Sequence, residues 1–211
     1  MMTKDLSDKI IAGLQKYYRN VSPNLRYANL YELAVAVVLS AQTTDRQVNS
    51  VTGALFRKYP DFKTLAQARL ADVRTMIRST GFYRNKSKNI VNLAKQVMER
   101  FSGRLPDVRE ELVTLPGIGR KSANVILAMG FGKPALAVDT HVLRVAYRLA
   151  YTDLKKPLAV EKALMSFIPE KKWKLAHLLF IEHGRSLCRA RKPLCHQCPI
   201  NAYCDSPDKI R

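Results

Sequence analysis

Residues 115–125 read Leu-Pro-Gly-Ile-Gly-Arg-Lys-Ser-Ala-Asn-Val. A short helical pattern precedes this stretch and an apolar-periodic one follows it, so the sequence predicts a helix, a tight hairpin and a second helix over about 108–130. We expect Gly117 and Gly119 to adopt backbone conformations that side chains disfavour, which would aim successive N–H groups at one point near a helix N-terminus. A phosphate anion suits that point. A lone GxG often only turns the chain, but LPGxGxKxA between two helices is far more specific.

Lys121 stands beside Arg120 in the first turn of the second predicted helix. The helix N-terminus and the neighbouring cation both disfavour an ammonium, so we expect this amine to lose its proton readily and to attack an electrophilic carbon. Taken alone, the residue would more simply contact a phosphate. Asp139 follows eighteen residues later, where Asp139 or Thr140 can cap the next helix. A carboxylate at a helix entry can cap the helix and also serve chemistry.

The remaining chain predicts an all-α fold, because helical periodicity recurs while strand signals are nearly absent. Leu33–Leu39 is the longest apolar stretch and is far too short to cross a membrane, so it predicts a buried helix. On the helix at 140–150, Arg144 and Arg148 are expected on the outer face. The expected helices run near residues 4–18, 30–40, 44–58, 69–78, 86–101, 108–114, 119–130, 140–150, 158–167 and 173–187.

The charge of the chain points to a polyanionic partner. The 211 residues include 36 Lys and Arg against 17 Asp and Glu, a formal net charge of +19, while 47% hydrophobic residues supply a core. Phosphate neutralisation by such a surface releases counterions, so nucleic acid is the expected partner. The segment 171–192 concentrates this charge, with seven basic residues against Glu182. A generally basic solvated surface is the alternative.

The four cysteines all lie near the C-terminus with the spacing C-x6-C-x2-C-x5-C, at Cys188, Cys195, Cys198 and Cys204. The first residues include acids and lack the apolar core of a secretory signal, so we expect a cytoplasmic protein, in which disulfides are disfavoured. A tight cysteine cluster then indicates a metal. One C-x2-C with wider flanking gaps favours a four-iron cluster over zinc, although zinc and unligated thiols stay open. The two nearby histidines, His183 and His196, are expected to be bystanders.

Together these pieces resemble the bacterial endonuclease III family of the helix-hairpin-helix superfamily, over about residues 20–204. The stretches that carry the resemblance are LSAQTTD at 39–45, GFYRNKSKNI at 81–90, LPGIGRKSANV at 115–125, VDTHVLRV at 138–145 and the complete cysteine pattern. The resemblance implies a bifunctional DNA N-glycosylase and abasic-site lyase of base excision repair. Its expected substrate is damaged double-stranded DNA that contains oxidised pyrimidines.

The resemblance also implies an architecture and a cofactor. We expect a six-helix barrel over 23–133 that includes the helix-hairpin-helix at about 108–130, and an iron–sulfur cluster domain formed by 1–22 and 134–211. A [4Fe-4S] cluster is expected on Cys188, Cys195, Cys198 and Cys204. The protein is expected to be a monomer without membrane attachment, cytoplasmic and associated with the nucleoid.

Residue roles follow from the resemblance as well. Lys121 is implied as the nucleophile that attacks C1′ and forms an imine, and Asp139 as the carboxylate that stabilises charge on the sugar and assists the lysine. Gln42 matches the residue that fills the gap left by a flipped base. Phe82 stands where the family usually has the leucine wedge, and an aromatic ring can also separate bases. Further DNA contacts are expected at Gly117, Gly119, Arg120, Arg144, Arg189 and Arg191, and base-pocket contacts at Ser40 and Asp45, either of which could instead cap the helix expected at 44.

Two other functions fit parts of the pattern. A non-catalytic DNA-binding iron–sulfur protein would use the same hairpin, but it would need neither Lys121 nor Asp139. The adenine-specific glycosylase branch shares the cluster, typically lacks the lysine and adds a C-terminal recognition domain, whereas only seven residues follow Cys204 here.

Overall fold

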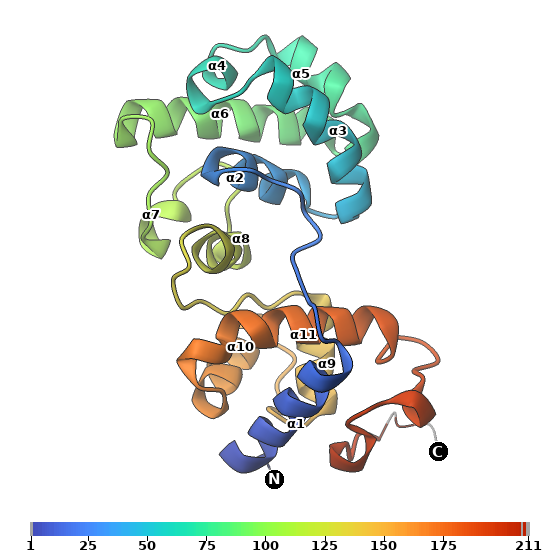
Figure 1. Ribbon diagram of the computed structural model, residues 1–211. Helices are drawn as coiled ribbons and strands as arrows, with labels where there is room; N and C mark the ends of the chain where they lie inside the picture. The colour runs from blue at the N-terminus through green and yellow to red at the C-terminus, as the bar shows by residue number, and fades with distance from the viewer. Residues whose placement is uncertain (1, 208, 210–211) are drawn as a thin grey trace. The chain divides into compact units, whose positions relative to one another are not determined.

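The computed structural model describes residues 2–207 and 209, and every regular element among them is helical (Figure 1). The predicted all-α class is confirmed. The chain divides into two units. Pro23–Lys133 forms the first, which we call the continuous unit. Met1–Ser22 and Pro134–Arg211 together form the second, the composite unit.

The described residues of the continuous unit form a set of α-helices joined by short turns. They are α2 (Leu30–Leu39), α3 (Asp45–Lys58), α4 (Phe62–Ala66), α5 (Leu70–Met76), α6 (Tyr83–Phe101), α7 (Arg109–Leu112) and α8 (Arg120–Val125). A 3-10 turn, η1 (Arg78–Thr80), precedes α6, and a π-helical turn, η2 (Ile126–Gly130), continues α8.

Helix α2 is the centre of the continuous unit. Its sequence LYELAVAVVL is apolar on every face from Leu33 onward, and eight of its ten residues are buried. It contacts α3, α6, α8 and η2. The helix begins at Asn29, whose side-chain oxygen accepts a hydrogen bond from the backbone N–H of Glu32 at 2.9 Å. The predicted buried helix is therefore confirmed.

The composite unit contains α1 (Lys4–Tyr17), α9 (Thr140–Arg148), α10 (Pro157–Phe167) and α11 (Trp173–Ser186). Short 3-10 turns lie at η3 (Glu170–Lys172), η4 (Cys195–Gln197) and η5 (Asn201–Tyr203).

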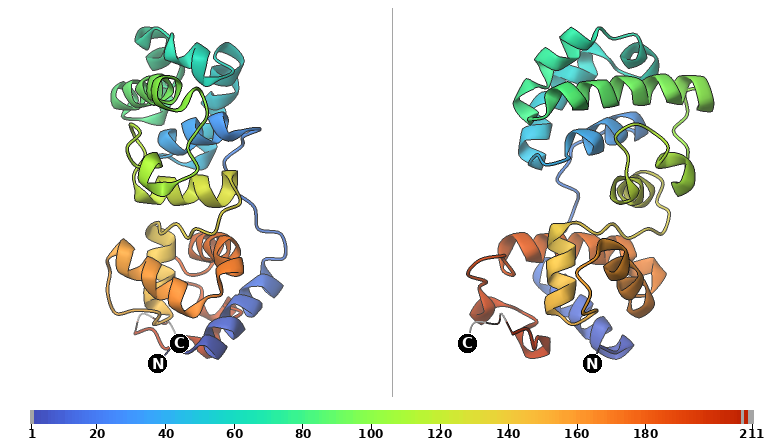
Figure 2. Two further views of the ribbon diagram at one scale, coloured as in Figure 1. Left: turned by 90° about the vertical axis from the view of Figure 1, so that its left-hand side faces the viewer. Right: turned by 180° about the vertical axis from the view of Figure 1, so that it is seen from behind.

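The core of the composite unit draws on both ends of its sequence. Ile10 and Leu14 of α1 belong to the same buried cluster as Val142 of α9 and Phe180 of α11, and all four side chains are fully buried. Both views of Figure 2 show the blue N-terminal helix among the orange and red segments of this unit. The N-terminal helix is thus an integral part of the fold of residues 134–211.

The predicted helices are confirmed, with ends that shift by a few residues. The prediction missed α4, because five residues are too few to show periodicity. Its start depends on a capping box between Asp61 and Thr64 instead. The helix predicted over 119–130 keeps α-helical hydrogen bonding only to Val125, and η2 begins at Ile126. None of the helices in the described part of the chain has the length and apolar character that a bilayer crossing demands.

Candidate functional site

The hairpin between α7 and α8 requires glycine at one of its two positions. Gly117 has φ +80°, and a Cβ there would lie 2.8 Å from Val38 Cγ1 and 3.1 Å from Asn89 Cβ. Conformation and space both exclude a side chain at this position. Gly119 differs from the prediction, because its φ of −94° and ψ of 179° are open to any residue. A Cβ on Gly119 would meet no atom within 4 Å, so the approach to the N-terminus of α8 is open.

Lys121 is the second residue of α8, and its side chain is exposed beside that of Arg120. A hydrogen bond below the exposed face holds the hairpin together. Arg109 of α7 donates from Nε to Oδ1 of Asn124 at 2.8 Å, and Asn124 is fully buried in α8. The amine of Lys121 is therefore carried by a helix that is fixed to its neighbour from within the unit.

Asp139 is the N-cap of α9, as one of the two predicted options had it. Its Oδ1 accepts hydrogen bonds from the backbone N–H groups of His141 and Val142, both at 2.8 Å. The segment before it is also anchored, because Nδ1 of the buried His177 lies 2.8 Å from the Ala137 carbonyl oxygen. Capping engages Oδ1, so the carboxylate has a fixed direction while it keeps its second oxygen outside the cap.

Two strained loops of the continuous unit carry the residue predicted to fill the gap left by a flipped base and the residue predicted to separate stacked bases. Gln42 has φ +52° and Phe82 has φ +47°, a region that residues with side chains seldom adopt. Phe82 is 65% exposed, which is unusual for a large apolar side chain. Both residues line one pocket together with Gly117 and Lys86. The structure thus brings three of the predicted DNA contacts together.

The two residues expected to line a base pocket have clear local roles. Ser40 ends α2, and its Oγ donates to the Val37 carbonyl at 2.8 Å. Asp45 is the first residue of α3, whose N-cap is Thr44. The alternative that Ser40 or Asp45 caps this helix is therefore wrong. Their contact with a base stays a prediction.

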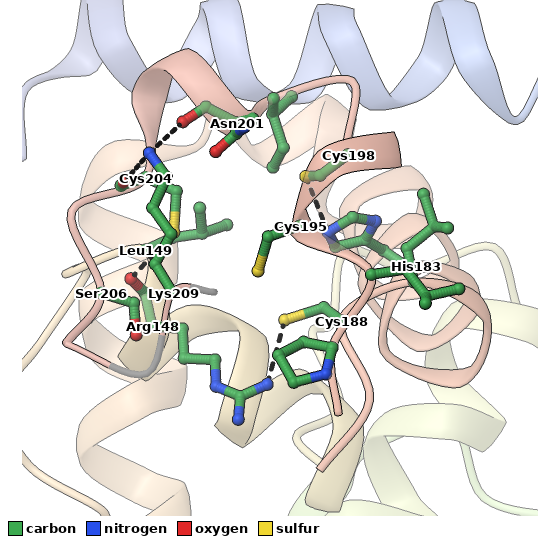
Figure 3. A pocket seen from close by; sticks show the side chains of 14 residues that line it. Arg148, Leu149, His183, Cys188, Cys195, Cys198, Asn201, Cys204, Ser206 and Lys209 are labelled. Carbon is green, nitrogen blue, oxygen red and sulfur yellow. Dashed lines mark hydrogen bonds between the residues drawn. The ribbon is translucent and has the colours of Figure 1, made fainter. Parts of the chain in front are cut away.

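Four thiols line one pocket of the composite unit, and none of them forms a disulfide (Figure 3). The space between them is bounded largely by apolar side chains, among them Leu149, Leu187 and Ile200. Among the described residues, no three His, Cys, Asp or Glu side chains converge as the ligands of a single ion do. Four thiols spread around such a space suit a multi-iron cluster. The thiols belong to Cys188, Cys195, Cys198 and Cys204.

Burial sets the protonation of the groups in this pocket. It raises the pKa of the Cys198 thiol to about 11 and also raises the pKa of Cys204, so both are neutral thiols until a metal displaces their protons. Burial lowers the pKa of His183 to about 4, so its ring is neutral near pH 7. The ring lies between two partners, with Nε2 3.7 Å from Cys198 Sγ and Nδ1 3.0 Å from the Tyr18 hydroxyl. His196 instead contacts its neighbour Gln197.

Two arginines of α9 hold the cysteine-bearing loop. Arg144 donates from Nε to the Cys188 carbonyl at 3.0 Å and from Nη2 to the Gly184 carbonyl at 2.7 Å. Arg148 is 8% exposed, so the prediction that it faces outward is wrong. The loop after α11 folds back over α9, and its carbonyls accept hydrogen bonds from the Arg148 guanidinium. Helical periodicity alone does not reveal such a contact. The DNA contact of Arg144 stays a prediction, and the structure gives it an internal role.

The basic segment 171–192 is partly engaged within the unit. Lys172 forms an ion pair with Asp8 of α1 at 2.7 Å. Arg189 and Arg191 are exposed, and Nε of Arg189 donates to the Ser186 carbonyl at 2.7 Å. The two arginines predicted to contact DNA are thus available at the surface next to the thiol pocket.

Lys86 is a site residue that the sequence analysis missed. It is 4% exposed and lines the pocket beneath Gln42 and Phe82. The signal was present in the sequence, since Lys86 lies in phase with the apolar stripe of α6 that continues through Ile90 and Val97. A lysine on a buried stripe is rare unless it has polar partners.

Comparisons with known proteins agree on one group. Residues 35–170 match the family model of HhH-GPD superfamily base excision DNA repair proteins, and 188–204 match the iron-sulfur binding domain of endonuclease III. The chain is 44% identical over 204 residues to endonuclease III of Synechocystis sp., which covers 96% of this chain and 93% of that protein. Two similar solved structures are a non-covalent endonuclease III–DNA complex and a trapped endonuclease III–DNA covalent intermediate with an estranged adenine. Each has TM-score 0.92 and 41% identity over 97% of this chain, and 96% and 97% of the respective chains are covered.

Proposed function

This chain belongs to the endonuclease III family within the HhH-GPD superfamily of base excision DNA repair proteins, and on that premise we propose that it removes oxidised pyrimidines from duplex DNA and then cleaves the strand 3′ of the abasic site. The observation that carries this proposal is the placement of Lys121. Its exposed amine follows the open N-terminus at Gly119 and stands on a helix fixed through Asn124. An accessible amine on a rigid support is what covalent catalysis by lysine needs.

The reaction begins with the neutral Nζ of Lys121 as nucleophile. It attacks C1′ of the flipped nucleotide, the glycosidic bond breaks, and the base leaves with the bonding electrons and takes up a proton. Opening of the sugar ring leaves an imine between Nζ and C1′. The imine acidifies C2′, so loss of that proton expels the 3′ phosphate by β-elimination, and water then releases the lysine. Splitting one displacement into these steps lowers each barrier.

Asp139 supports this chemistry through charge. Its carboxylate stabilises the positive charge that develops on the sugar as the base departs, and it assists proton removal from the lysine. The cap of α9 fixes the direction of the group through Oδ1. A preorganised carboxylate needs little rearrangement when charge develops.

The flipped nucleotide leaves a gap in the duplex, and exposed residues of the continuous unit fill it. We assign gap filling to Gln42 and wedge insertion to Phe82, whose exposed ring stands where relatives usually have leucine. Unstacking costs a few kcal/mol, which damage at the base reduces. Phosphate contacts come from Gly117, Gly119, Arg120, Arg144, Arg189 and Arg191, and base-pocket contacts from Ser40 and Asp45.

The iron–sulfur domain carries a [4Fe-4S] cluster, and its proposed ligands are the four thiols that line one pocket, those of Cys188, Cys195, Cys198 and Cys204. When bound, the cluster supplies iron–thiolate bonds that close the loop between the first and the last ligand. The chain's own contribution is to shield this loop with apolar side chains and to present Arg189 and Arg191 beside it.

The proposal also covers the two domains of the chain and the form in which the enzyme acts. Residues 23–133 form the six-helix barrel domain with the hairpin at about 108–130, and 1–22 with 134–211 form the cluster domain. The proposed active form is a monomer, because one chain supplies the lysine, the aspartate, the wedge and the cluster ligands of the proposal. Its proposed location is the cytoplasm, in association with the nucleoid.

Borohydride trapping tests this function. Duplex DNA with an oxidised pyrimidine or an abasic site is incubated with the protein and borohydride, which reduces the imine to a stable protein–DNA adduct. We expect the wild-type protein to form the adduct and Lys121→Gln to lose it while DNA binding is retained. Lys63→Gln, which removes an exposed lysine from α4 of the same unit, is the matched control and should trap fully.

Two outcomes contradict the proposal. Wild-type protein that binds damaged DNA but never traps, over several lesions and abasic sites, would favour the non-catalytic DNA-binding function. Trapping that persists in Lys121→Gln would mean that another amine is the nucleophile.

A further inference from the structure

Lys86 is a buried cation whose hydrogen-bond partners are neutral. Its Nζ donates to the Thr80 carbonyl at 2.9 Å and to the hydroxyl of Thr43. Desolvation lowers the pKa of this lysine, and no carboxylate in the described part of the chain offsets that effect. Burying an ammonium without a counter-ion is costly, so a structural or functional demand must hold it there.

The ammonium connects two loops that are distant in sequence. Thr43 belongs to the loop between α2 and α3, and Thr80 ends η1 just before α6. The Thr43 hydroxyl also contacts the Thr80 carbonyl, so three groups close one small network. A second contact joins the same segments, because Gln47 Nε2 donates to Ser79 Oγ at 2.7 Å. Lys86 is the charged centre of this junction.

Each tied loop carries one of the strained residues. Gln42 immediately precedes Thr43, and Phe82 follows Thr80 after Gly81. Both Gln42 and Phe82 keep positive φ angles, which are strained for residues with a side chain and persist only when the surroundings hold them. Neither side chain is buried. The carbonyl of Phe82 accepts from the backbone N–H groups of Asn85 and Lys86, and the side-chain hydrogen bonds of Lys86 add a restraint that reaches both loops.

Lys86 also lines the pocket between the two loops. Gln42, Phe82 and Asn89 line the same pocket, with Gly117 of the hairpin on its wall. The spacing between the Gln42 loop and the Phe82 loop is thus fixed where the Lys86 ammonium binds both. Because one Nζ binds Thr43 in the first loop and Thr80 before the second, a change at Lys86 reaches both loops at once.

We propose that Lys86 is a positioning residue that locks the Gln42 loop to the Phe82 loop, so that gap filling and wedge insertion occur as one event. This inference rests on the proposed function. It predicts that removal of the ammonium slows steps that require an opposing strand more than it slows chemistry at a sugar without one.

Lys86→Met tests this directly, because methionine keeps most of the side-chain length and removes the charge and its donors. The holo full-length variant is assayed on duplex DNA with an oxidised pyrimidine, and 2-aminopurine is the base opposite the lesion. We expect single-turnover excision to fall about 10- to 100-fold, the scale of a positioning defect. The increase in 2-aminopurine fluorescence that saturating protein causes should also be smaller for the variant than for the wild type. The ratio of lyase rates on duplex and single-stranded abasic DNA should drop in parallel.

A folded Lys86→Met protein that matches the wild type within twofold in excision rate, fluorescence and rate ratio would overturn the inference. Borohydride trapping by the wild type keeps that failure distinct from a failure of the proposed function. If Lys86→Met does not fold, Thr43→Val and Thr43→Ser carry the test. We expect the valine, which lacks the hydroxyl, to slow duplex excision several-fold and the serine to restore it. Equal rates for the two would contradict the lock.

Discussion

The guanidinium of Arg148 donates from Nη1 to the Sγ of Cys188 over 3.5 Å, so a helix residue contacts a thiol of the proposed cluster site. The same group donates to the Arg189 carbonyl at 2.7 Å and to the Ala190 carbonyl at 3.3 Å. One buried side chain thereby fixes the first ligand and the two residues that follow it. The loop that holds the thiols is fastened to α9 at its beginning.

Replacement of Arg148 by methionine should release this loop. The change removes a charged donor from part-buried hydrogen bonds with the Arg189 and Ala190 carbonyls, a loss of about 1.5–3 kcal/mol. We expect the visible absorbance of the cluster to decay several-fold faster in the presence of an iron chelator. Arg191→Met, which removes an exposed arginine from the same loop, is the matched control. Identical decay of both variants would show that Arg148 does not secure the loop.

The four thiols predict a metal content. Aerobically purified protein should be yellow-brown, with broad absorbance near 400 nm and about four irons per chain. Serine at Cys198 should weaken cluster retention and DNA binding more than it alters chemistry in the enzyme that still binds DNA. Metal analysis and visible spectra check this. Freshly isolated native protein with stoichiometric zinc and no iron would refute the assignment.

The two hairpin glycines should respond differently to alanine. At Gly117 a methyl group meets Val38 at 2.8 Å on a backbone with φ +80°, and we expect a loss of about 1–3 kcal/mol. At Gly119 only the cap preference is lost, about 0.5–1 kcal/mol, but the methyl group projects where a phosphate would approach. Thermal unfolding of the holo protein should show the larger shift for Gly117→Ala, at about 2–4 °C per kcal/mol. Equal shifts would contradict the geometry of the hairpin.

Asp139→Asn separates the cap from the chemistry. Asparagine is also a good N-cap, so the melting temperature should change little. The neutral amide cannot stabilise a cationic sugar, and single-turnover excision should fall by about 10²-fold or more. Asp139→Ala serves for comparison, because it removes both functions and should cost about 1 kcal/mol of stability in addition. Excision by Asp139→Asn at the wild-type rate would remove the residue from the mechanism.

Binding should depend strongly on salt. The slope of log K against log salt is expected near −0.9 per neutralised phosphate on duplex DNA, as for other highly basic proteins. Arg191→Glu should make the slope shallower, and so should Arg189→Glu. Lys63→Glu changes the net charge by the same amount at a position on α4 and should leave the slope closer to the wild-type value. An affinity that hardly varies with salt would contradict a phosphate-dominated interface.

The helices and their caps could be predicted because their causes are local. The burial of α2 and the cap at Asp139 are each determined by a few adjacent residues. Arg148 could not be placed in this way, since it is buried by contacts with a segment about 40 residues away in the chain. The burial of Lys86 follows from the apolar stripe of α6, but its contact with Thr43 in a distant loop does not. The strict requirement for glycine at Gly117 also comes from a distant residue, Val38, which no motif records.

Helix α1 has a consequence for the order in which the molecule assembles during synthesis. Ile10 and Leu14 leave the ribosome long before Phe180, the residue of α11 that they share a core with. The whole sequence of the continuous unit lies between these two helices, so this unit can fold before α1 has its packing partners. The composite unit closes only when the last helix arrives, and the cysteines follow that helix in the chain. The four cysteines can therefore gather only after the hairpin of the continuous unit has had time to form.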